Sequence, residues 1–294
     1  MSGTGANPAA SIRQRLLNIS REQRFDFNRI LTDFGLQRLL YRLSVSPYHD
    51  EFVLKGAMLF SYWSGDAFRA TKDVDFLKSG EASIEYLKRV FTDLCDQAVE
   101  QDDGLIFDKA SVSAEEIRED DAYGGIRITM KAILSGARIS IQADIGIGDV
   151  ITPAAEEIDY PVLLELPSPK LKAYPVETVI AEKFEAMVHL GVANSRMKDF
   201  YDIWALIKFM KPDHEMMAVA IANTFRRRAT ALPDEVPAAL TSTFSRDEMK
   251  QRQWTAFIRR AAVGSSAKPT LHETVEEIRP LLMSLVDDAR YDHE

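Results

Sequence analysis

The sequence has very little cysteine and no long hydrophobic run. Its 294 residues include one cysteine, Cys95, which excludes an intrachain disulfide and a cysteine-based metal cluster. No apolar stretch approaches the roughly 20 residues that a membrane-spanning helix needs. The opening residues 1–18 lack the apolar core of a signal peptide. We therefore expect a cytoplasmic protein without a membrane partner.

Several common catalytic signatures are also missing. The five histidines show no metal-ligand spacing, and the chain contains no Walker loop, no Gly-x-Gly-x-x-Gly fingerprint and no Gly-x-Ser-x-Gly elbow. P-loop, Rossmann and serine-hydrolase interpretations therefore lack support. With 46% apolar and 28% charged residues, the composition is that of an ordinary globular protein.

The net charge of −9 argues against a nucleic-acid partner only when it is taken over the whole chain. Residues 81–121 hold thirteen acidic and four basic residues, so the remainder is close to neutral. This acidic stretch is either a solubility feature or a docking surface. A basic cluster is the candidate for contact with an RNA backbone, although a solvated helix face explains it equally well. Its members are Arg226, Arg227, Arg228, Arg246, Lys250, Arg252, Arg259 and Arg260.

The periodicity of apolar residues predicts an α+β fold in three regions. We expect N-terminal helices in residues 1–46 behind a disordered tail at 1–11, an α/β lobe with a small mixed sheet in 47–171, and a helical lobe in 172–294. A proline-rich connector at 161–175 separates the lobes. The expected strands are 52–54, 71–77, 105–112, 126–134 and 138–147, and the later helices are 83–100, 177–190, 197–210, 215–228, 246–260 and 271–288.

Carboxylates on the predicted strands are the first candidates for a catalytic metal site. Asp73 and Asp75 are two residues apart, so in a strand both side chains point to one face. Two carboxylates held together favour a cation between them, and Mg²⁺ prefers such oxygen ligands. Asp144, on the polar side of another predicted strand, is the candidate third ligand, with Asp149 as a competitor. Three converging acids suit metal-assisted phosphoryl or nucleotidyl transfer.

A glycine turn precedes these carboxylates. Lys55, Gly56 and Ala57 stand where a strand passes into a helix, and a glycine there lets the backbone approach a phosphate closely. Basic and hydroxyl side chains in the segment just before Asp73 are further candidates for binding phosphates, although a solvated loop explains each one alone. They are Arg69, Thr71 and Lys72.

The helical lobe contains charged residues on apolar stripes. Lys183 shares a helical stripe with apolar residues, as do Asp199 and Asp202 on the next helix, so the charges need partners. We expect an ion pair between Lys183 and Asp199. The pair either only ties the two helices together, or Asp199 orients Lys183 toward nucleotide phosphates. Arg196 is a candidate fork for a phosphate or a carboxylate.

Four blocks of this sequence, in this order, are similar to those of a known family. The chain resembles the AbiEii/AbiGii family of nucleotidyltransferase toxins, within the DNA polymerase β-like nucleotidyltransferase superfamily, over most of its length. The resemblance implies a polymerase β-like lobe followed by a helical lobe. One departure is that the superfamily's Gly-Ser is Gly56-Ala57 here, so a serine contact to phosphate is missing. The blocks are 52–60, 69–75, 182–186 and 196–203.

The resemblance also implies roles for individual residues. Asp73 and Asp75 would be catalytic and bind Mg²⁺ or Mn²⁺, Gly56 and its neighbours would cradle the triphosphate of an NTP, and Lys183 with Asp199 and Asp202 would complete the nucleotide site. A toxin of a toxin–antitoxin or phage-defence system is implied, with an antitoxin as partner and a tRNA 3′ end as acceptor. Two alternatives remain open: NTP-dependent modification of a protein side chain, by nucleotidylation or phosphorylation, and a non-catalytic nucleotide-binding module.

Overall fold

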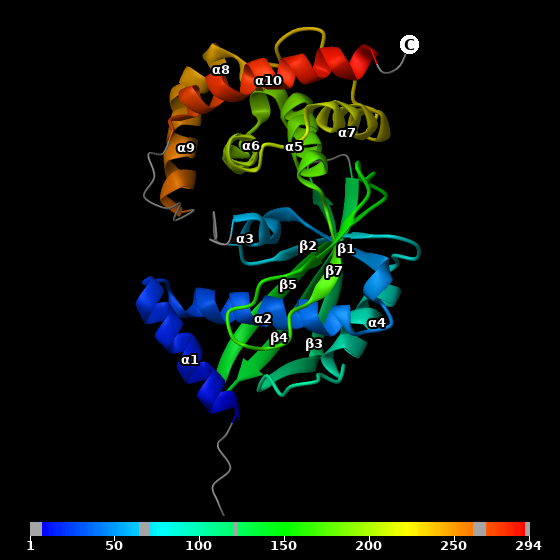
Figure 1. Cartoon of the computed structure of the whole chain (residues 1–294), viewed down its shortest axis with the longest axis vertical. Helices are drawn as coiled ribbons and strands as arrows, with labels where there is room; N and C mark the ends of the chain where they lie inside the picture. The colour runs from blue at the N-terminus through cyan, green and yellow to red at the C-terminus, as the bar shows by residue number, and fades with distance from the viewer. Residues whose placement is uncertain (1–7, 65–70, 120–122, 261–268, 292–294) are drawn as a thin grey trace, which may run out of the picture. The chain divides into compact units, whose positions relative to one another are not determined.

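The computed structural model describes residues 8–64, 71–119, 123–260 and 269–291, which form two compact units (Figure 1). The first unit contains the described residues up to Gly148 and Glu157–Ala173; the second contains Asp149–Glu156 and those from Tyr174 onward. A mixed sheet in the first unit and helices in the second confirm the predicted α+β fold. None of the described helices is long and apolar enough to span a bilayer.

A seven-stranded mixed sheet forms the centre of the first unit (Figure 1). Its order is β3-β4-β5-β2-β1-β7-β6. Strands β3, β4 and β5 form an antiparallel meander, β2 runs parallel to β5 and antiparallel to β1, and β1 runs parallel to β7. The bounds are β1 Phe52–Lys55, β2 Val74–Lys78, β3 Leu105–Glu119, β4 Tyr123–Leu134, β5 Ala137–Ile147, β6 Glu156–Asp159 and β7 Lys170–Ala173.

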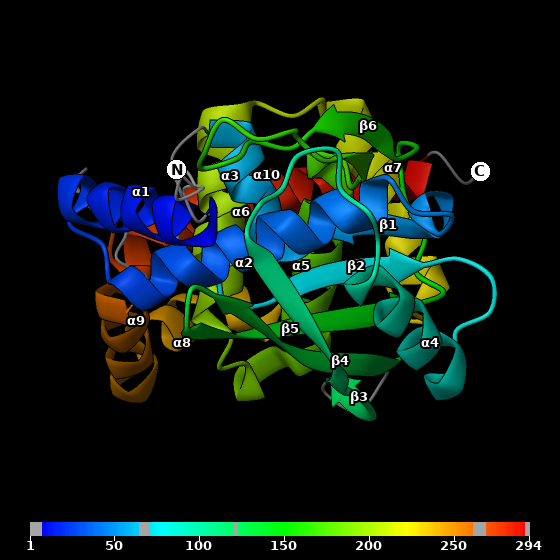
Figure 2. The same cartoon turned by 90° about the horizontal axis from the view of Figure 1, so that it is seen from below.

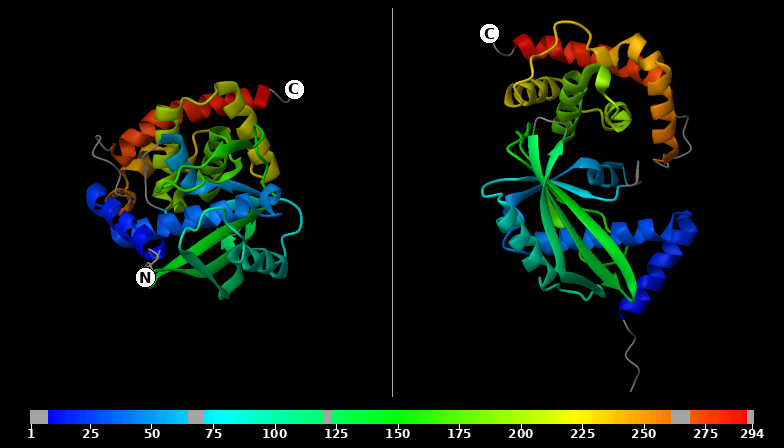
Figure 3. Two further views of the ribbon diagram at one scale, coloured as in Figure 1. Left: turned by 60° about the horizontal axis from the view of Figure 1, so that its bottom comes forward. Right: turned by 180° about the vertical axis from the view of Figure 1, so that it is seen from behind.

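One face of the sheet is buried under helices, and the alternation of β5 shows why. Ile139 and Ile141 are buried, whereas Arg138, which precedes them, and Ser140, which lies between them, are exposed. Helix α2 (Phe27–Ser44) crosses the buried face (Figure 2), where a Cβ added to Gly35 would lie 3.2 Å from both isoleucines. The opposite face of the meander carries polar side chains. The other helices of this unit are α1 Pro8–Gln23, α3 Leu59–Ser64 and α4 Ile84–Cys95, the last packed on β3 (Figure 3).

A buried ion cluster ties α2 to the segment before β3. Arg38 Nε lies 2.8 Å and Arg42 Nη1 lies 2.7 Å from Asp103 Oδ2, and all three residues are at most 5% exposed. A buried charge is tolerated only with such partners. At least one acid of the stretch 81–121 is therefore internal rather than part of a surface.

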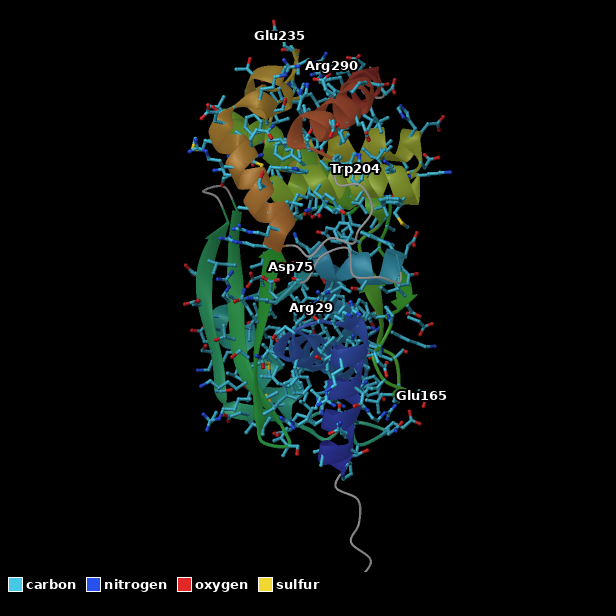
Figure 4. The ribbon with its side chains drawn as sticks, turned by 90° about the vertical axis from the view of Figure 1, so that its left-hand side faces the viewer. Arg29, Asp75, Glu165, Trp204, Glu235 and Arg290 are labelled. Carbon is cyan, nitrogen blue, oxygen red and sulfur yellow. The ribbon has the colours of Figure 1, made fainter. Side chains whose placement is uncertain are left out.

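The second unit consists of helices packed around an aromatic core (Figure 1). Phe184 of α5 and Phe225 of α7 are at most 1% exposed, with their ring centroids 5.5 Å apart. Trp204 of α6, labelled in Figure 4, donates a hydrogen bond from its indole to Glu277 of α10. The helices are α5 Val176–Leu190, α6 Met197–Met210, α7 His214–Arg227, α8 Ser242–Arg246, α9 Glu248–Arg260 and α10 Leu271–Tyr291.

The structure differs from the sequence-based prediction at several element boundaries. The helix expected at 246–260 is present as α9 but begins at Glu248, and a separate short helix, α8, ends at Arg246. The break lies at Asp247, which has an extended backbone and whose carboxylate accepts hydrogen bonds from the amides of Met249 and Lys250. Helix α1 begins at Pro8, inside the expected tail. Strand β6, just before the connector expected at 161–175, and strand β7, inside it, were not predicted, because these four-residue segments contain only one and two apolar residues.

Candidate active site

A row of charged side chains crosses the first unit's sheet at Asp75 of β2, the aspartate labelled in Figure 4. Asp75 is paired with Lys55 on β1 and with Asp144 on β5, and Asp144 is paired in turn with Arg127 on β4. Directly paired residues place their side chains on the same face of a sheet. The row therefore brings two acids and two bases to one face.

Asp73 joins this row from just before β2. Val74 and Phe76 are fully buried, whereas Asp73 and Asp75 are both partly exposed, as a period of two requires. The hydroxyl of Thr71 donates a hydrogen bond of 2.6 Å to Asp73 Oδ1. The two carboxylates thus share the side of the strand that is open to solvent.

Gly56 begins a one-turn 3₁₀ helix directly after β1 and lies against Asp75. Its φ of +76° belongs to the left-handed region that favours glycine. A Cβ at this position would be only 1.9 Å from Asp75 Oδ2. Backbone and carboxylate approach closely here, and only glycine permits it. The following helix α3 has six described residues, so close backbone approach, rather than a long helix dipole, is what the structure offers to a phosphate.

The carboxylate of Asp144 is bound within the sheet. Arg127 donates to both of its oxygens, at 2.8 and 2.7 Å, and Gln142 Nε2 lies 3.3 and 3.2 Å from the same two oxygens. The hydrogen bond to Asp144 raises the pKa of Arg127. Within the described ranges, no three His, Cys, Asp or Glu side chains are grouped closely enough to hold a metal. A metal-binding role for Asp144 stays a prediction.

The other predicted residues of the first unit lie in different settings. The Lys55 ammonium reaches β5, where a Cβ added to Gly146 would be 3.4 Å from Nζ. Ala57 is buried and Lys72 is exposed. Arg69 falls outside the described residues. Phosphate-binding roles for these residues stay predictions.

Lys183 of α5 is the centre of the predicted cluster in the second unit. Its Nζ lies 2.8 Å from Asp199 Oδ1 and 2.9 Å from Asp202 Oδ2, both on α6. Arg196, just before α6, places Nε 2.7 Å from Asp199 Oδ2. Burial alone would raise the pKa of the fully buried Asp199, but Lys183 and Arg196 outweigh burial and lower it to about 2. The expected ion pair is present, and its role toward a nucleotide stays a prediction.

A second buried cluster in the same unit was not found from the sequence. Arg228 lies 3.2 Å from Asp149, 3.5 Å from Glu182 and 2.9 Å from Glu185, and the acids raise its pKa against the opposing effect of burial. Its place in a run of three arginines suggests either contact with an RNA backbone or a solvated helix face. Lys250, another member of that basic cluster, is also buried, with its amine 2.7 Å from a backbone carbonyl. Lys250 is therefore internal, and the Arg228 side chain is only 12% exposed.

Arg127 and Gln142 are the residues near the site that sequence reasoning missed. Both occupy the polar side of alternating strands, but so do several other residues of β4 and β5. Only the strand register pairs Arg127 with Asp144 rather than with Gln142 or Ser140, and register depends on the hairpin at Ser135 and Gly136.

Comparisons with known proteins show which family and fold the chain is similar to. A family model described as "Nucleotidyl transferase AbiEii toxin, Type IV TA system" matches residues 38–278. A crystal structure of a candidate nucleotidyltransferase from H. pylori is similar with a TM-score of 0.53 at 14% identity, covering 92% of this chain and 100% of that one. No curated protein matches the chain.

Two further structures are more distant. JHP933 from Helicobacter pylori has a TM-score of 0.48 at 15% identity, over 89% of this chain and 94% of its own. An antigenic nucleotidyltransferase-like protein from Paracoccidioides brasiliensis has a TM-score of 0.41 at 12% identity, over 87% and 93%.

Proposed function

Because the chain belongs to the AbiEii family of nucleotidyl transferase toxins of type IV toxin–antitoxin systems, and is a nucleotidyltransferase, we propose that its acceptor is the 3′-terminal hydroxyl of a tRNA and its metal Mg²⁺. The family implies an NTP as substrate and an antitoxin as partner. In the reaction, the acceptor hydroxyl releases its proton to solvent and its oxygen bonds to the α-phosphorus. The bond from that phosphorus to the oxygen shared with the β-phosphorus breaks, and pyrophosphate leaves with that oxygen. A role in phage defence is part of the same proposal.

This proposal rests on one observation: Asp73 and Asp75 lie on the same side of β2, and the Gly56 turn lies against Asp75. Mg²⁺ is commonly held by one or two protein carboxylates, with substrate phosphates completing its shell. Asp73 and Asp75 fit that role because both lie partly exposed on one side of β2. Mn²⁺ has the same ligand preference. A divalent ion bound there would neutralise phosphate charge and lower the pKa of the attacking hydroxyl.

The chain's own residues would position the nucleotide. Gly56 lies against the Asp75 carboxylate, so the backbone amides of Gly56 and Ala57 are candidates for cradling a triphosphate, with Lys55, the cross-strand neighbour of Asp75, alongside. In the second unit, Asp199 and Asp202 hold the Lys183 ammonium in one orientation, which suits a lysine that binds phosphates. Arg69, Thr71, Lys72 and Arg196 are further candidates for phosphate contacts.

Label transfer tests the proposal directly. The purified chain is incubated with total tRNA, Mg²⁺ and each NTP in turn, labelled on the α-phosphate in one set and on the γ-phosphate in another. We expect α-label, and no γ-label, to appear at the RNA 3′ end. Asp75→Asn should abolish transfer, whereas the exposed Asp159→Asn on β6 should not.

Each other outcome overturns part of the proposal. Label on protein would replace tRNA by a protein side chain as acceptor, and transferred γ-label would make the enzyme a phosphotransferase. An Asp75→Asn variant as active as the wild type would remove the active site from β2.

A further inference from the structure

The contact between Arg127 and Asp144 is the feature of the first unit that the metal-site hypothesis leaves unexplained. The Arg127 guanidinium engages the carboxylate edge-on, with Nε on one oxygen and Nη2 on the other. This is the bidentate geometry of a strong, oriented ion pair. Gln142 adds an amide N–H to the same carboxylate. Both oxygens of Asp144 are thus occupied by donors, and the residue is 8% exposed.

Such an arrangement fixes the arginine as much as the aspartate. A guanidinium has five N–H donors in a rigid plane, and Asp144 takes two of them on one edge. Asp144 is the hydrogen-bonding partner of this guanidinium within the described part of the chain. The Arg127 side chain is 34% exposed, so its other donors can meet a ligand on the open face of the sheet. An arginine held in this way is pre-organised for a second anion.

The order of the strands indicates whether the anion that Arg127 binds belongs to the NTP or to the acceptor. Gly56 follows β1, on one side of Asp75, whereas Arg127 is on β4, on the other side and two strands away. With strands spaced about 4.8 Å apart, the two Cα atoms of Arg127 and Asp75 are about 10 Å apart. In phosphoryl transfer the attacking and leaving oxygens lie roughly in line on opposite sides of the phosphorus. A triphosphate on the Gly56 side therefore leaves the Arg127 side to the acceptor.

We propose that Arg127, held in place by Asp144, binds a backbone phosphate of the acceptor nucleic acid next to its attacking hydroxyl. Asp144 is then a positioning residue that acts through Arg127, and Asp73 and Asp75 are the metal carboxylates. The inference rests on the proposed function, because it takes the acceptor to be a nucleic acid.

Steady-state kinetics and RNA binding test this assignment with four single variants and the double variant Arg127→Gln/Asp144→Asn. Arg127→Gln removes the guanidinium, and Asp144→Asn removes the charge that holds it. Lys131→Gln removes a positive charge from the same face of β4, two rows from Arg127. Glu115→Gln removes the exposed carboxylate paired with Arg127 on β3. Kd for fluorescent tRNA ending in a 3′-deoxynucleotide is measured without NTP, alongside kcat and both KM values.

The expected result is a selective loss at the acceptor. Arg127→Gln should weaken tRNA binding and raise KM for tRNA by about tenfold, since one charge-assisted contact is lost, and leave KM for the NTP unchanged. Asp144→Asn should give a smaller increase in the same parameter, with the Mg²⁺ dependence unaltered. The double variant should match Arg127→Gln, because Asp144 acts only through Arg127. Lys131→Gln and Glu115→Gln should stay within about twofold of the wild type.

Several outcomes would overturn the inference. A raised KM for the NTP alone would assign the phosphate to the nucleotide. A collapse of kcat and a shifted Mg²⁺ requirement in Asp144→Asn, beside an unaffected Arg127→Gln, would make Asp144 the third metal ligand. Arg127→Lys, which keeps the charge without the fork, decides the matter if Arg127→Gln unfolds, and it should also raise KM for tRNA. If the wild type transfers no label to RNA, the proposed function is wrong. Unchanged tRNA binding by Arg127→Gln would instead contradict this inference alone.

Discussion

Among the predicted site residues, Gly56 tolerates little change. An alanine there would adopt an unfavourable φ of +76° and would force its Cβ into the Asp75 carboxylate. We expect Gly56→Ala to lower the rate of nucleotidyl transfer about 100-fold or more, since displacement of a reacting group by about 1 Å has effects of that size. The label-transfer assay measures it.

Gly136 provides a matched control for this substitution. Its φ is +80°, but nothing lies within 4 Å of an added Cβ. Both alanine variants should lose about 1–2 kcal/mol of stability from the left-handed backbone, and only Gly56→Ala should lose activity. Equal losses of activity would mean that strain, rather than the contact with Asp75, explains the effect.

The low pKa of Asp199 predicts a pH-dependent contribution to stability. The group titrates near 2 in the folded chain against a usual 3.8, so its ion pairs stabilise the fold above about pH 4 and lose that effect as the pH falls through 2. Asp199→Asn should lower the free energy of unfolding at pH 7 by about 2 kcal/mol. Urea denaturation should show this difference shrinking toward pH 2.

An exposed ion pair gives the comparison for Asp199. Asp234 pairs with Arg290 at 2.7 Å, but its side chain is 95% exposed. Asp234→Asn should change the free energy of unfolding by less than about 1 kcal/mol at pH 7. A difference between wild type and Asp199→Asn that does not depend on pH would contradict the assigned pKa.

At the scale of secondary-structure elements, Arg228 links residue 149 to helix α5. It follows α7 and contacts three acids, Asp149, Glu182 and Glu185. Replacement by methionine would leave these carboxylates without their shared counter-ion. We expect Arg228→Met to destabilise the second unit by about 3–5 kcal/mol, measured by thermal or urea unfolding.

Arg252 on α9 is the control for this substitution. Its pair with Glu248 has both side chains at least 80% exposed. Arg252→Met should cost no more than about 0.5 kcal/mol. Comparable losses for the two variants would show that the buried cluster contributes no more than a surface pair.

The elements also show what the sequence could and could not predict. The shared face of Asp73 and Asp75 follows from the period of a strand, which requires knowledge of one strand only. The pairing of Asp144 with Arg127 requires the register between two strands, and a shift by one residue would exchange it for another neighbour. For the same reason Arg228 looked like a surface residue, because its three acids come from distant parts of the sequence.

At the scale of the whole molecule, the predicted site residues divide between the two units. Asp73, Asp75 and Gly56 belong to the first, and Lys183 with its two acids belongs to the second. The sequence could suggest this division because each set is a local pattern on one strand or on two successive helices. A joint role for the two sets does not follow from such patterns, because each pattern is local to its own unit.

Substitution of Lys183 tests whether the reaction requires a residue of the second unit. If Lys183 binds the phosphates of the nucleotide, Lys183→Met should raise KM for the NTP and lower kcat/KM by about 100-fold, because a charge-assisted contact to the reacting group is lost. Growth of cells that express this variant should be restored, as it should be for Asp75→Asn. Lys208→Met, which removes an exposed ammonium 4.5 Å above the Trp204 ring, should leave both toxicity and label transfer intact. Full transfer activity in a folded Lys183→Met variant would reduce the Lys183 cluster to a tie between α5 and α6 and confine the chemistry to the first unit.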